Sequence, residues 1–217
     1  MRKQVLQCVE AEKLIVIVRG VKQKKLIPLT EAMYKGGIRM LELTYGVNGD
    51  DSDEENAENI RILAEHFKDR MYIGAGTVLT EKQVELTKSA GGTFIISPDT
   101  YEDVIRKTRA LDMVSIPGAF TPGEIQNAHR AGADFVKIFP ATALGVSYIK
   151  AVRAPLSHIK MLAVGGIDEN NMADYLKVGV CGFGVGSNIV DKKLLANDDY
   201  QAITELAKVY AAVLKKE

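Results

Sequence analysis

Residues 159–187, IKMLAVGGIDENNMADYLKVGVCGFGVGS, contain two short apolar runs with a longer amphipathic segment between them. Each run, 159–164 and 181–185, has about the length of a strand and shows little alternation between apolar and polar residues. Such near-continuous runs suit parallel strands that are covered on both faces. The segment between them ends at Gly179, and glycine is the usual residue just past a helix. This stretch therefore predicts a strand–helix–strand unit.

The same unit recurs along the whole chain. The apolar runs are residues 14–18, 38–43, 71–75, 93–96, 113–116, 135–139, 159–164 and 181–185. The stretches with helical spacing are 22–35, 52–68, 80–90, 99–109, 121–131, 146–153, 168–178 and 200–215. Alternating strands and helices imply a parallel sheet, and eight such units close into a (β/α)8 TIM barrel. An open doubly wound sheet is the alternative, which the absence of G-x-G-x-x-G after the first run disfavours.

The length of 217 residues suits one large core, and no linker interrupts the pattern. We therefore expect a single barrel domain over residues 1–217, with an extra N-terminal helix covering the bottom of the barrel. Helix starts are indicated by the capping-box spacing of Ser52 with Glu55 and of Thr80 with Gln83. Thr121–Pro122 has the pattern of a cap followed by proline in the first turn.

The composition excludes several classes of protein. Lys and Arg number 28, as do Asp and Glu, whereas nucleic-acid-binding and polybasic membrane-binding proteins need excess positive charge. No apolar run approaches the roughly 18 residues that span a bilayer, and the N-terminus lacks the apolar stretch of a signal peptide. Cys8 and Cys181 are too few for a disulfide framework or a structural zinc site. We expect a cytoplasmic protein with no nucleic-acid or membrane partner.

The active site of such a barrel lies at the C-terminal ends of the strands, where Arg19, Glu42 and Lys137 are the ionisable side chains. Lys137 stands among apolar residues in the run 135–139. Pointing inward, it would lose solvation and its pKa would fall below about 10.4, which favours attack on carbonyl carbons and Schiff-base formation. The alternative is a lysine that points outward and reaches solvent between two helices.

The other two ionisable residues have two interpretations each. Glu42 lies between two leucines, and a carboxylate on a buried strand needs a partner or a function. It can serve as general acid and base beside Lys137, or form a structural ion pair with Lys137 or Arg19. Arg19 can hold a carboxylate or phosphate through two parallel hydrogen bonds, or be a charge on the rim.

Glycines follow the last two runs, as Gly165–Gly166 and as Gly186–Ser187. Glycine lets backbone N–H groups approach an anion closely, and these two loops form the usual phosphate site of phosphate-binding barrels. Two tight turns are the alternative. The histidines stand away from the ends of the runs, so we expect neither a histidine-based triad nor a metal site.

Six short motifs occur in order along the chain: GAGTV at 74–78, ISP at 96–98, IPG at 116–118, VKIFP at 136–140, GGI at 165–167 and GS at 186–187. In order and spacing they resemble the class I 2-keto-3-deoxy-6-phosphogluconate (KDPG) aldolases, also described as 4-hydroxy-2-oxoglutarate (KHG) aldolases. The resemblance covers nearly the whole chain. It implies a barrel that assembles as a homotrimer and needs no metal or other cofactor.

The resemblance also implies roles for individual residues. The Schiff-base lysine corresponds to Lys137 and the general acid/base to Glu42. The substrate-binding positions are Thr77 near the pyruvate carboxylate, Phe139 beside the lysine, and Gly165, Gly166, Gly186 and Ser187 around the phosphate.

Two positions depart from the family pattern. No arginine follows Glu42 closely, so the substrate carboxylate is assigned to Arg19, where other members carry an arginine. Val164 stands in place of a threonine that is common in the gluconate enzymes. A valine here is similar to the 6-phosphogalactonate aldolases, which accept the other configuration at C4.

The implied reaction is reversible cleavage of KDPG to pyruvate and glyceraldehyde 3-phosphate, and of 4-hydroxy-2-oxoglutarate to pyruvate and glyoxylate. Three alternatives stay open. The first is a 2-keto-3-deoxy-6-phosphogalactonate (KDPGal) aldolase of the same family. The second is a phosphosugar isomerase with Glu42 as base, and the third is a non-catalytic barrel that binds a phosphometabolite.

Overall fold

The computed structural model describes residues 1–46 and 52–215. Its strands are β1 Leu14–Val18, β2 Met40–Thr44, β3 Tyr72–Gly76, β4 Phe94–Ile96, β5 Val114–Ile116, β6 Gly118–Ala119, β7 Val136–Ile138, β8 Met161–Val164 and β9 Gly182–Val185. They are joined side by side in the order β5-β4-β3-β2-β1-β9-β8-β7-β6, and the recorded pairs are all parallel. The predicted (β/α)8 barrel is confirmed, and each strand that was expected begins within two residues of its apolar run.

The barrel closes through a strand that is interrupted by Pro117. β5 pairs with β4 on one side of this proline, and β6 pairs with β7 on the other. Proline has no N–H to donate, so the ladder breaks at this residue. A backbone hydrogen bond still joins the proline to the next strand: the N–H of Lys137 on β7 donates to the carbonyl of Pro117 at 2.8 Å. The short strand β6, which the sequence pattern did not predict, is thus the continuation of β5.

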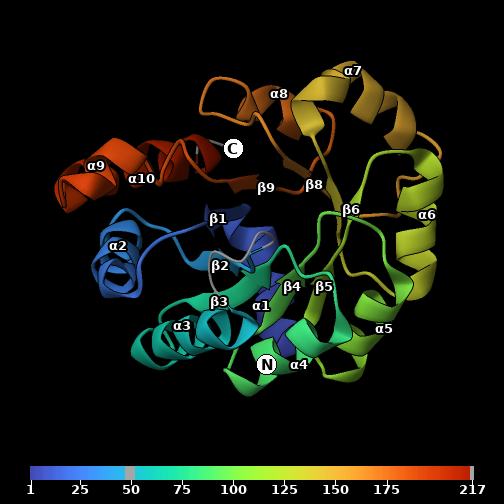
Figure 1. The fold of residues 1–217 in the computed structure, drawn as a ribbon. Coiled ribbons are helices and arrows are strands. Elements are labelled where there is room, and N and C mark those ends of the chain that lie inside the picture. Colours follow the sequence, from blue (N-terminus) through green and yellow to red (C-terminus); the bar gives the residue numbers. More distant parts are fainter. Residues whose placement is uncertain (47–51, 216–217) are drawn as a thin grey trace.

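Helices surround the strands (Figure 1). They are α1 Arg2–Glu12, α2 Gln23–Lys35, α3 Asp53–His66, α4 Glu81–Ser89, α5 Glu102–Ala110, α6 Pro122–Ala131, α7 Ala141–Arg153, α8 Met172–Lys177, α9 Lys192–Ala196 and α10 Tyr200–Leu214. α9 was not predicted. α7 begins at 141 rather than 146, because a first turn that was not predicted precedes the predicted segment. Gly145, with a φ of 72°, is not helical and forms a kink between the two parts. α8 begins at 172 rather than 168, because Asp168 Oδ1 accepts from the N–H groups of Asn170 and Asn171 and forms a turn there.

The helix caps follow the sequence signals with one exception. Ser52 and Glu55 form the predicted capping box, and Thr121 caps α6 with the help of Glu124. Thr80 Oγ1 accepts the N–H of Gln83 at 3.2 Å as predicted. The Gln83 side chain, however, accepts from the N–H of Leu79 rather than that of Thr80. The second half of that predicted box is therefore wrong.

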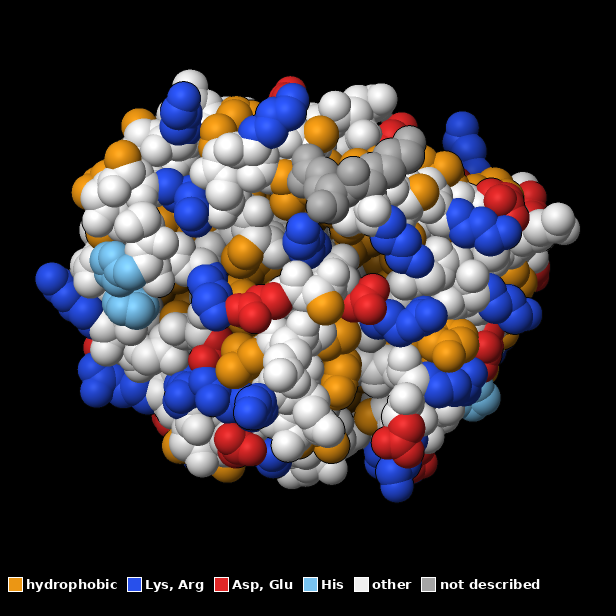
Figure 2. Space-filling model, turned by 180° about the vertical axis from the view of Figure 1, so that it is seen from behind, with side chains coloured by type: hydrophobic (Ala, Val, Ile, Leu, Met, Phe, Trp, Pro, Cys, Tyr) orange, Lys and Arg blue, Asp and Glu red, His pale blue; other side chains and the backbone are white. Residues whose placement is uncertain are grey.

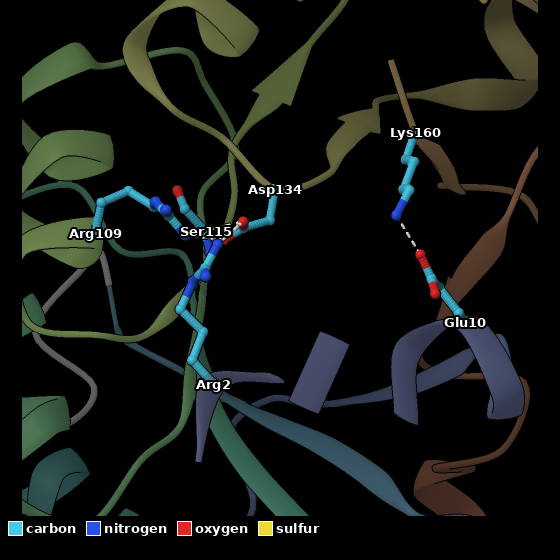
Figure 3. A network of polar contacts seen from close by, with 6 residues as sticks. All are labelled: Arg2, Glu10, Arg109, Ser115, Asp134 and Lys160. Carbon is cyan, nitrogen blue, oxygen red and sulfur yellow. Dashed lines mark hydrogen bonds and ion pairs between the residues drawn. The ribbon is translucent and has the colours of Figure 1, made fainter. Parts of the chain in front are cut away.

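The N-terminal helix α1 covers the bottom of the barrel, as predicted. Val5 and Val9 are buried in one cluster with residues from the N-terminal parts of the strands, such as Ile15 and Phe94. Two polar contacts hold the helix in place (Figure 3). One joins Glu10 to Lys160 and the other joins Arg2 to Asp134.

Asp134 is the centre of the second contact. Its side chain is only 9% exposed and pairs with two arginines, Arg2 and Arg109. The Arg109 Nη1 to Asp134 Oδ1 distance is 2.9 Å, and the N–H of Ser115 donates to Oδ2 at 3.0 Å (Figure 3). Burial still raises the pKa of the Asp134 carboxyl group, so these donors offset only part of its loss of hydration.

Charged side chains of both signs lie on the face of the molecule shown in Figure 2. On the face shown in Figure 2, acidic side chains are interspersed among the lysines and arginines. In the part of the chain that the structure describes, we find no helix long and apolar enough to cross a membrane.

Candidate active site

Lys137 and Glu42 line one pocket inside the barrel. Lys137 stands on β7 and is 7% exposed, and Glu42 stands on β2 and is 2% exposed. The pocket is otherwise lined by Ile15, Ile17, Ile96, Ile116, Leu162, Val164, Phe183 and Gly184. The alternative in which Lys137 points outward to solvent is therefore wrong. The two groups share an apolar environment, where charge is costly and each affects the protonation of the other.

Burial dominates the protonation of Glu42. It raises the pKa of this carboxyl group to about 7, although the positive charges of Lys137 and Arg19 act in the opposite direction. The Oε2 atom is buried and has no hydrogen-bond partner among the described residues. Buried carboxylate oxygens are nearly always satisfied, so an unpaired one that faces a pocket is a candidate proton acceptor.

Lys137 is affected in the opposite sense. Burial lowers the pKa of its amine, and the charge of Arg19 lowers it further, while Glu42 partly restores it. The Nζ atom lies 4.6 Å from the centre of the Phe139 ring, which is itself partly exposed at the mouth. A lysine held in this way has a larger neutral fraction at physiological pH, and the neutral amine is the nucleophilic form.

Arg19 and Thr77 come together at the ends of β1 and β3. Arg19 Nη2 donates a hydrogen bond to Thr77 Oγ1 at 3.0 Å. Thr77 has a φ of 56°, which is an unusual, strained conformation for a residue branched at Cβ. Strain of this kind concentrates at functional sites, where the surrounding structure must hold it. The two predicted carboxylate-binding residues are thus direct partners.

The two predicted phosphate loops also have special backbone geometry. Gly165 and Gly166 have φ values of 93° and 76°, in the region that favours glycine. After β9 the chain makes a tight turn, in which the carbonyl of Gly186 accepts the N–H groups of Ile189 and Val190. The N–H of Ser187 donates to no other described residue, and its side chain is exposed.

Sequence reasoning missed the side chains that hold these loops. Thr142 of α7 donates to the carbonyl of Gly165, Asn171 before α8 to that of Gly166, and Asn188 to that of Ile167. Nothing in their local sequence marks these three residues, because each acts on a loop at least five positions away. Gly76 lies against Glu42, and the GAGTV motif to which it belongs gives no sign of this contact.

Within residues 1–46 and 52–215, no three His, Cys, Asp or Glu side chains gather in an arrangement that could hold a metal ion.

A parallel barrel that buries a lysine beside an unpaired carboxylate is an architecture suited to enzymes that use a lysine nucleophile. The chain belongs to the KDPG and KHG aldolase family, whose model matches residues 5–206.

Relatives and solved structures agree with this assignment. A Rhizobium meliloti (strain 1021) protein named probable 2-dehydro-3-deoxy-6-phosphogalactonate aldolase is 37% identical over 201 residues, which is 92% of each chain. A 2-dehydro-3-deoxy-phosphogluconate aldolase of Haemophilus influenzae is 30% identical over 217 residues, 98% of each chain. A native KDPGal structure has a TM-score of 0.84 at 30% identity and covers 94% of both chains. The KDPG aldolase of Legionella pneumophila, solved with pyruvate as a covalent carbinolamine, has a TM-score of 0.85 at 29% identity, with 94% and 97% coverage.

Proposed function

We propose that this protein is a class I aldolase that cleaves KDPG to pyruvate and glyceraldehyde 3-phosphate through a Schiff base on Lys137. The observation that carries the proposal is the pair of buried, oppositely perturbed groups, Lys137 with a lowered pKa and Glu42 with a raised one. Groups whose environments move their pKa values toward neutrality suit nucleophilic and acid–base roles. 4-Hydroxy-2-oxoglutarate, which yields pyruvate and glyoxylate, is a second substrate of the same site.

The proposed reaction begins when the neutral amine of Lys137 attacks the C2 ketone of the substrate. The carbinolamine hydroxyl takes up a proton from solvent and leaves as water, which gives a protonated imine that can accept an electron pair. Glu42 then removes the proton of the C4 hydroxyl, the C3–C4 bond breaks, and its electrons form an enamine. The aldehyde leaves, Glu42 returns a proton to C3, and water hydrolyses the imine to pyruvate and free Lys137.

The remaining site residues bind the substrate in this proposal. Arg19, positioned by its hydrogen bond to Thr77, pairs with the carboxylate of the pyruvate portion. Phe139 covers the imine at the mouth. The phosphate binds at the loops that contain Gly165, Gly166, Gly186 and Ser187, where backbone N–H groups can donate to its oxygens.

The galactonate epimer, KDPGal, is a second candidate substrate. Val164 is buried and lines the pocket of Lys137 and Glu42, so it offers no hydroxyl to a substrate oxygen. The Rhizobium meliloti relative named for the galactonate substrate is also the more similar of the two described above. Measuring kcat/KM for both epimers under identical conditions decides between them.

Borohydride trapping tests the proposed chemistry. The protein is incubated with pyruvate and reduced, its intact mass is taken, and the modified peptide is mapped. We expect a pyruvate adduct on Lys137 in the wild-type protein and none in either variant. Lys137→Ala has no amine, and the guanidinium of Lys137→Arg stays protonated. A phosphosugar isomerase or a non-catalytic binding barrel would give no adduct even with the wild-type protein. Retained aldolase activity in either variant would contradict the assignment.

We also propose that the protein is a homotrimer. Three exposed large hydrophobic residues outside the substrate site follow neighbouring strands around one part of the mouth: Leu79, Tyr101 and Phe120. An apolar rim of this kind is typical of a protein–protein contact. A 29% identical chain with a TM-score of 0.83 occurs in a cage designed by fusing symmetric oligomeric domains. Light scattering after size exclusion measures the oligomeric state. The double variant with Phe120→Ser and Tyr101→Ser should weaken the association of the trimer.

A cytoplasmic location remains part of the proposal. Both cysteines, Cys8 and Cys181, are free thiols, as is usual for proteins of a reducing compartment. Cell fractionation with compartment markers tests this location.

A further inference from the structure

Three consecutive carbonyl groups after β8 are each held by another part of the chain. The carbonyl of Gly165 accepts from both the N–H and the Oγ1 of Thr142, at 3.2 Å each. The carbonyl of Gly166 accepts from Asn171 Nδ2 at 2.9 Å, and that of Ile167 accepts from Asn188 Nδ2 at 3.2 Å. The donors come from α7, from the start of α8 and from the turn after β9.

These contacts fix the direction of the loop's N–H groups. In a trans peptide the N–H of one residue points opposite to the carbonyl of the residue before it. With the carbonyls of Gly165 and Gly166 held, the N–H groups of Gly166 and Ile167 point away from their anchors. Neither N–H donates to another described residue. The loop therefore offers two oriented donors, which is the arrangement that binds an anion.

Asn188 differs from the other two anchors because it belongs to the second loop. Its backbone N–H and that of Ser187 donate to no other residue in the described ranges. Its side chain crosses to the carbonyl of Ile167 in the first loop, where Nδ2 donates at 3.2 Å. Asn188 thus ties the second loop directly to the first.

We propose that Asn188 is a positioning residue that holds the two loops at the separation required by a phosphate monoester. It brings the free N–H groups on either side of the anion into one site and so favours phosphorylated substrates over unphosphorylated ones. The inference rests on the proposed function for its substrates. Binding of inorganic phosphate tests it independently of catalysis.

The test compares Asn188→Ala and Asn188→Asp with wild type and with Asn127→Ala. Asn127 is an exposed residue of α6 and controls for the loss of a surface amide. KM and kcat are measured with the phosphorylated sugar acid and with 4-hydroxy-2-oxoglutarate, which carries no phosphate. Inorganic phosphate is titrated into each protein by calorimetry. Asn188→Asp nearly preserves the size of the side chain, so a folding defect in the alanine variant does not end the test.

We expect Asn188→Ala to raise KM for the phosphorylated substrate, and to weaken phosphate binding, by about tenfold, the usual effect of losing one hydrogen bond in a site. The value of kcat, and both constants for 4-hydroxy-2-oxoglutarate, should stay within about twofold of wild type. Asn188→Asp should lose more, because its carboxylate cannot donate and repels the anion.

Two outcomes would overturn the inference. One is an unchanged KM and unchanged phosphate affinity in both variants. The other is an equal loss on both substrates, which indicates a general structural role. Pyruvate trapping on Lys137 separates these outcomes from failure of the proposed function. A wild-type protein that binds phosphate through Asn188 but forms no adduct would keep the inference and reject the aldolase.

Discussion

Gly76 lies directly against the carboxyl group of Glu42. A Cβ atom on residue 76 would stand 2.6 Å from both Cδ and Oε1 of Glu42, well inside van der Waals contact. The two residues are on adjacent strands, and Glu42 pairs in register with Gly74. The glycine at position 76 therefore provides the space in which the carboxylate sits, and a methyl group at this position would have to push the carboxylate aside.

Gly76→Ala should displace Glu42 without touching Lys137. Because a misplaced acid–base group commonly costs two orders of magnitude, we expect kcat for cleavage to fall by about 100-fold. Pyruvate trapping on Lys137 should continue. Steady-state kinetics and borohydride trapping on the same sample check both parts. Gly123→Ala, whose Cβ would have only one neighbour, at 4.0 Å, is the matched control and should be active.

The pH dependence of kcat should report the ionisation of Glu42. The carboxyl group must be ionised to accept the C4 hydroxyl proton, and burial raises its pKa to about 7 in the free protein. At saturating substrate Lys137 is already bound as the imine, so kcat should fall about tenfold per pH unit below the pKa that Glu42 has in the enzyme–substrate complex. The measurement is a kcat profile from about pH 5 to 9. A flat profile over this range would show that Glu42 is not the base.

Glu42→Gln should stabilise the protein while removing activity. The folded pKa of about 7 exceeds the ordinary value of 4.5, so the unfolded chain releases this proton first. Wild-type stability therefore falls as the pH rises from 4.5 to about 7, whereas the glutamine variant escapes this loss. Each tenfold difference in proton affinity corresponds to about 1.4 kcal/mol, which predicts a gain of about 3 kcal/mol above pH 7.

Urea unfolding of both proteins at about pH 5 and pH 8 measures this difference. The exposed Glu205, changed to Gln, is the control and should alter the free energy of unfolding by less than about 0.5 kcal/mol at either pH. An equal difference between wild type and Glu42→Gln at the two pH values would count against a raised pKa.

Asp134→Ala should destabilise the bottom of the barrel without affecting the chemistry at its mouth. Removing this carboxylate leaves Arg2 and Arg109 without their shared partner and the N–H of Ser115 without its acceptor. We expect a loss of about 2–3 kcal/mol in the free energy of unfolding, below the roughly 3–5 kcal/mol of fully buried pairs, because the side chains of Arg2 and Arg109 are 22% and 33% exposed. Denaturant unfolding measures the loss, and pyruvate trapping on Lys137 should be unchanged.

Glu10→Ala removes the other polar contact of α1 and serves as the comparison. The side chains of Glu10 and Lys160 are 44% and 54% exposed, so their ion pair should contribute less than about 1 kcal/mol. Equal losses of unfolding free energy in Asp134→Ala and Glu10→Ala would mean that burial does not determine how much these contacts contribute to stability.

Much of the fold was predictable because it depends on local rules. Runs of apolar residues, glycines past helix ends and capping residues act over a few positions, and they predicted the eight-unit barrel and the helix at its bottom. Where a local rule met an exception, the prediction was wrong in a specific way. The first turn of α7, before the kink at Gly145, was not predicted, and Pro117 divided one barrel strand into β5 and β6.

The candidate site was predictable only as a set of positions. The order of the strands implied that Lys137, Glu42 and Arg19 stand toward one end of the barrel, since parallel strands end together. Periodicity did not decide whether Lys137 points inward, because both of its neighbours on the strand are apolar and buried. The direction of the side chain follows from the strands that pair with it.

The chain thus carries its architecture and its reactive residue types in short-range patterns, whereas the working geometry arises from contacts between distant elements. The space beside Glu42 depends on a glycine 34 positions later. The anchors of the Gly165–Ile167 loop come from positions 142, 171 and 188. Burial, which moves both pKa values toward neutrality, exists only when eight strands close around the two groups.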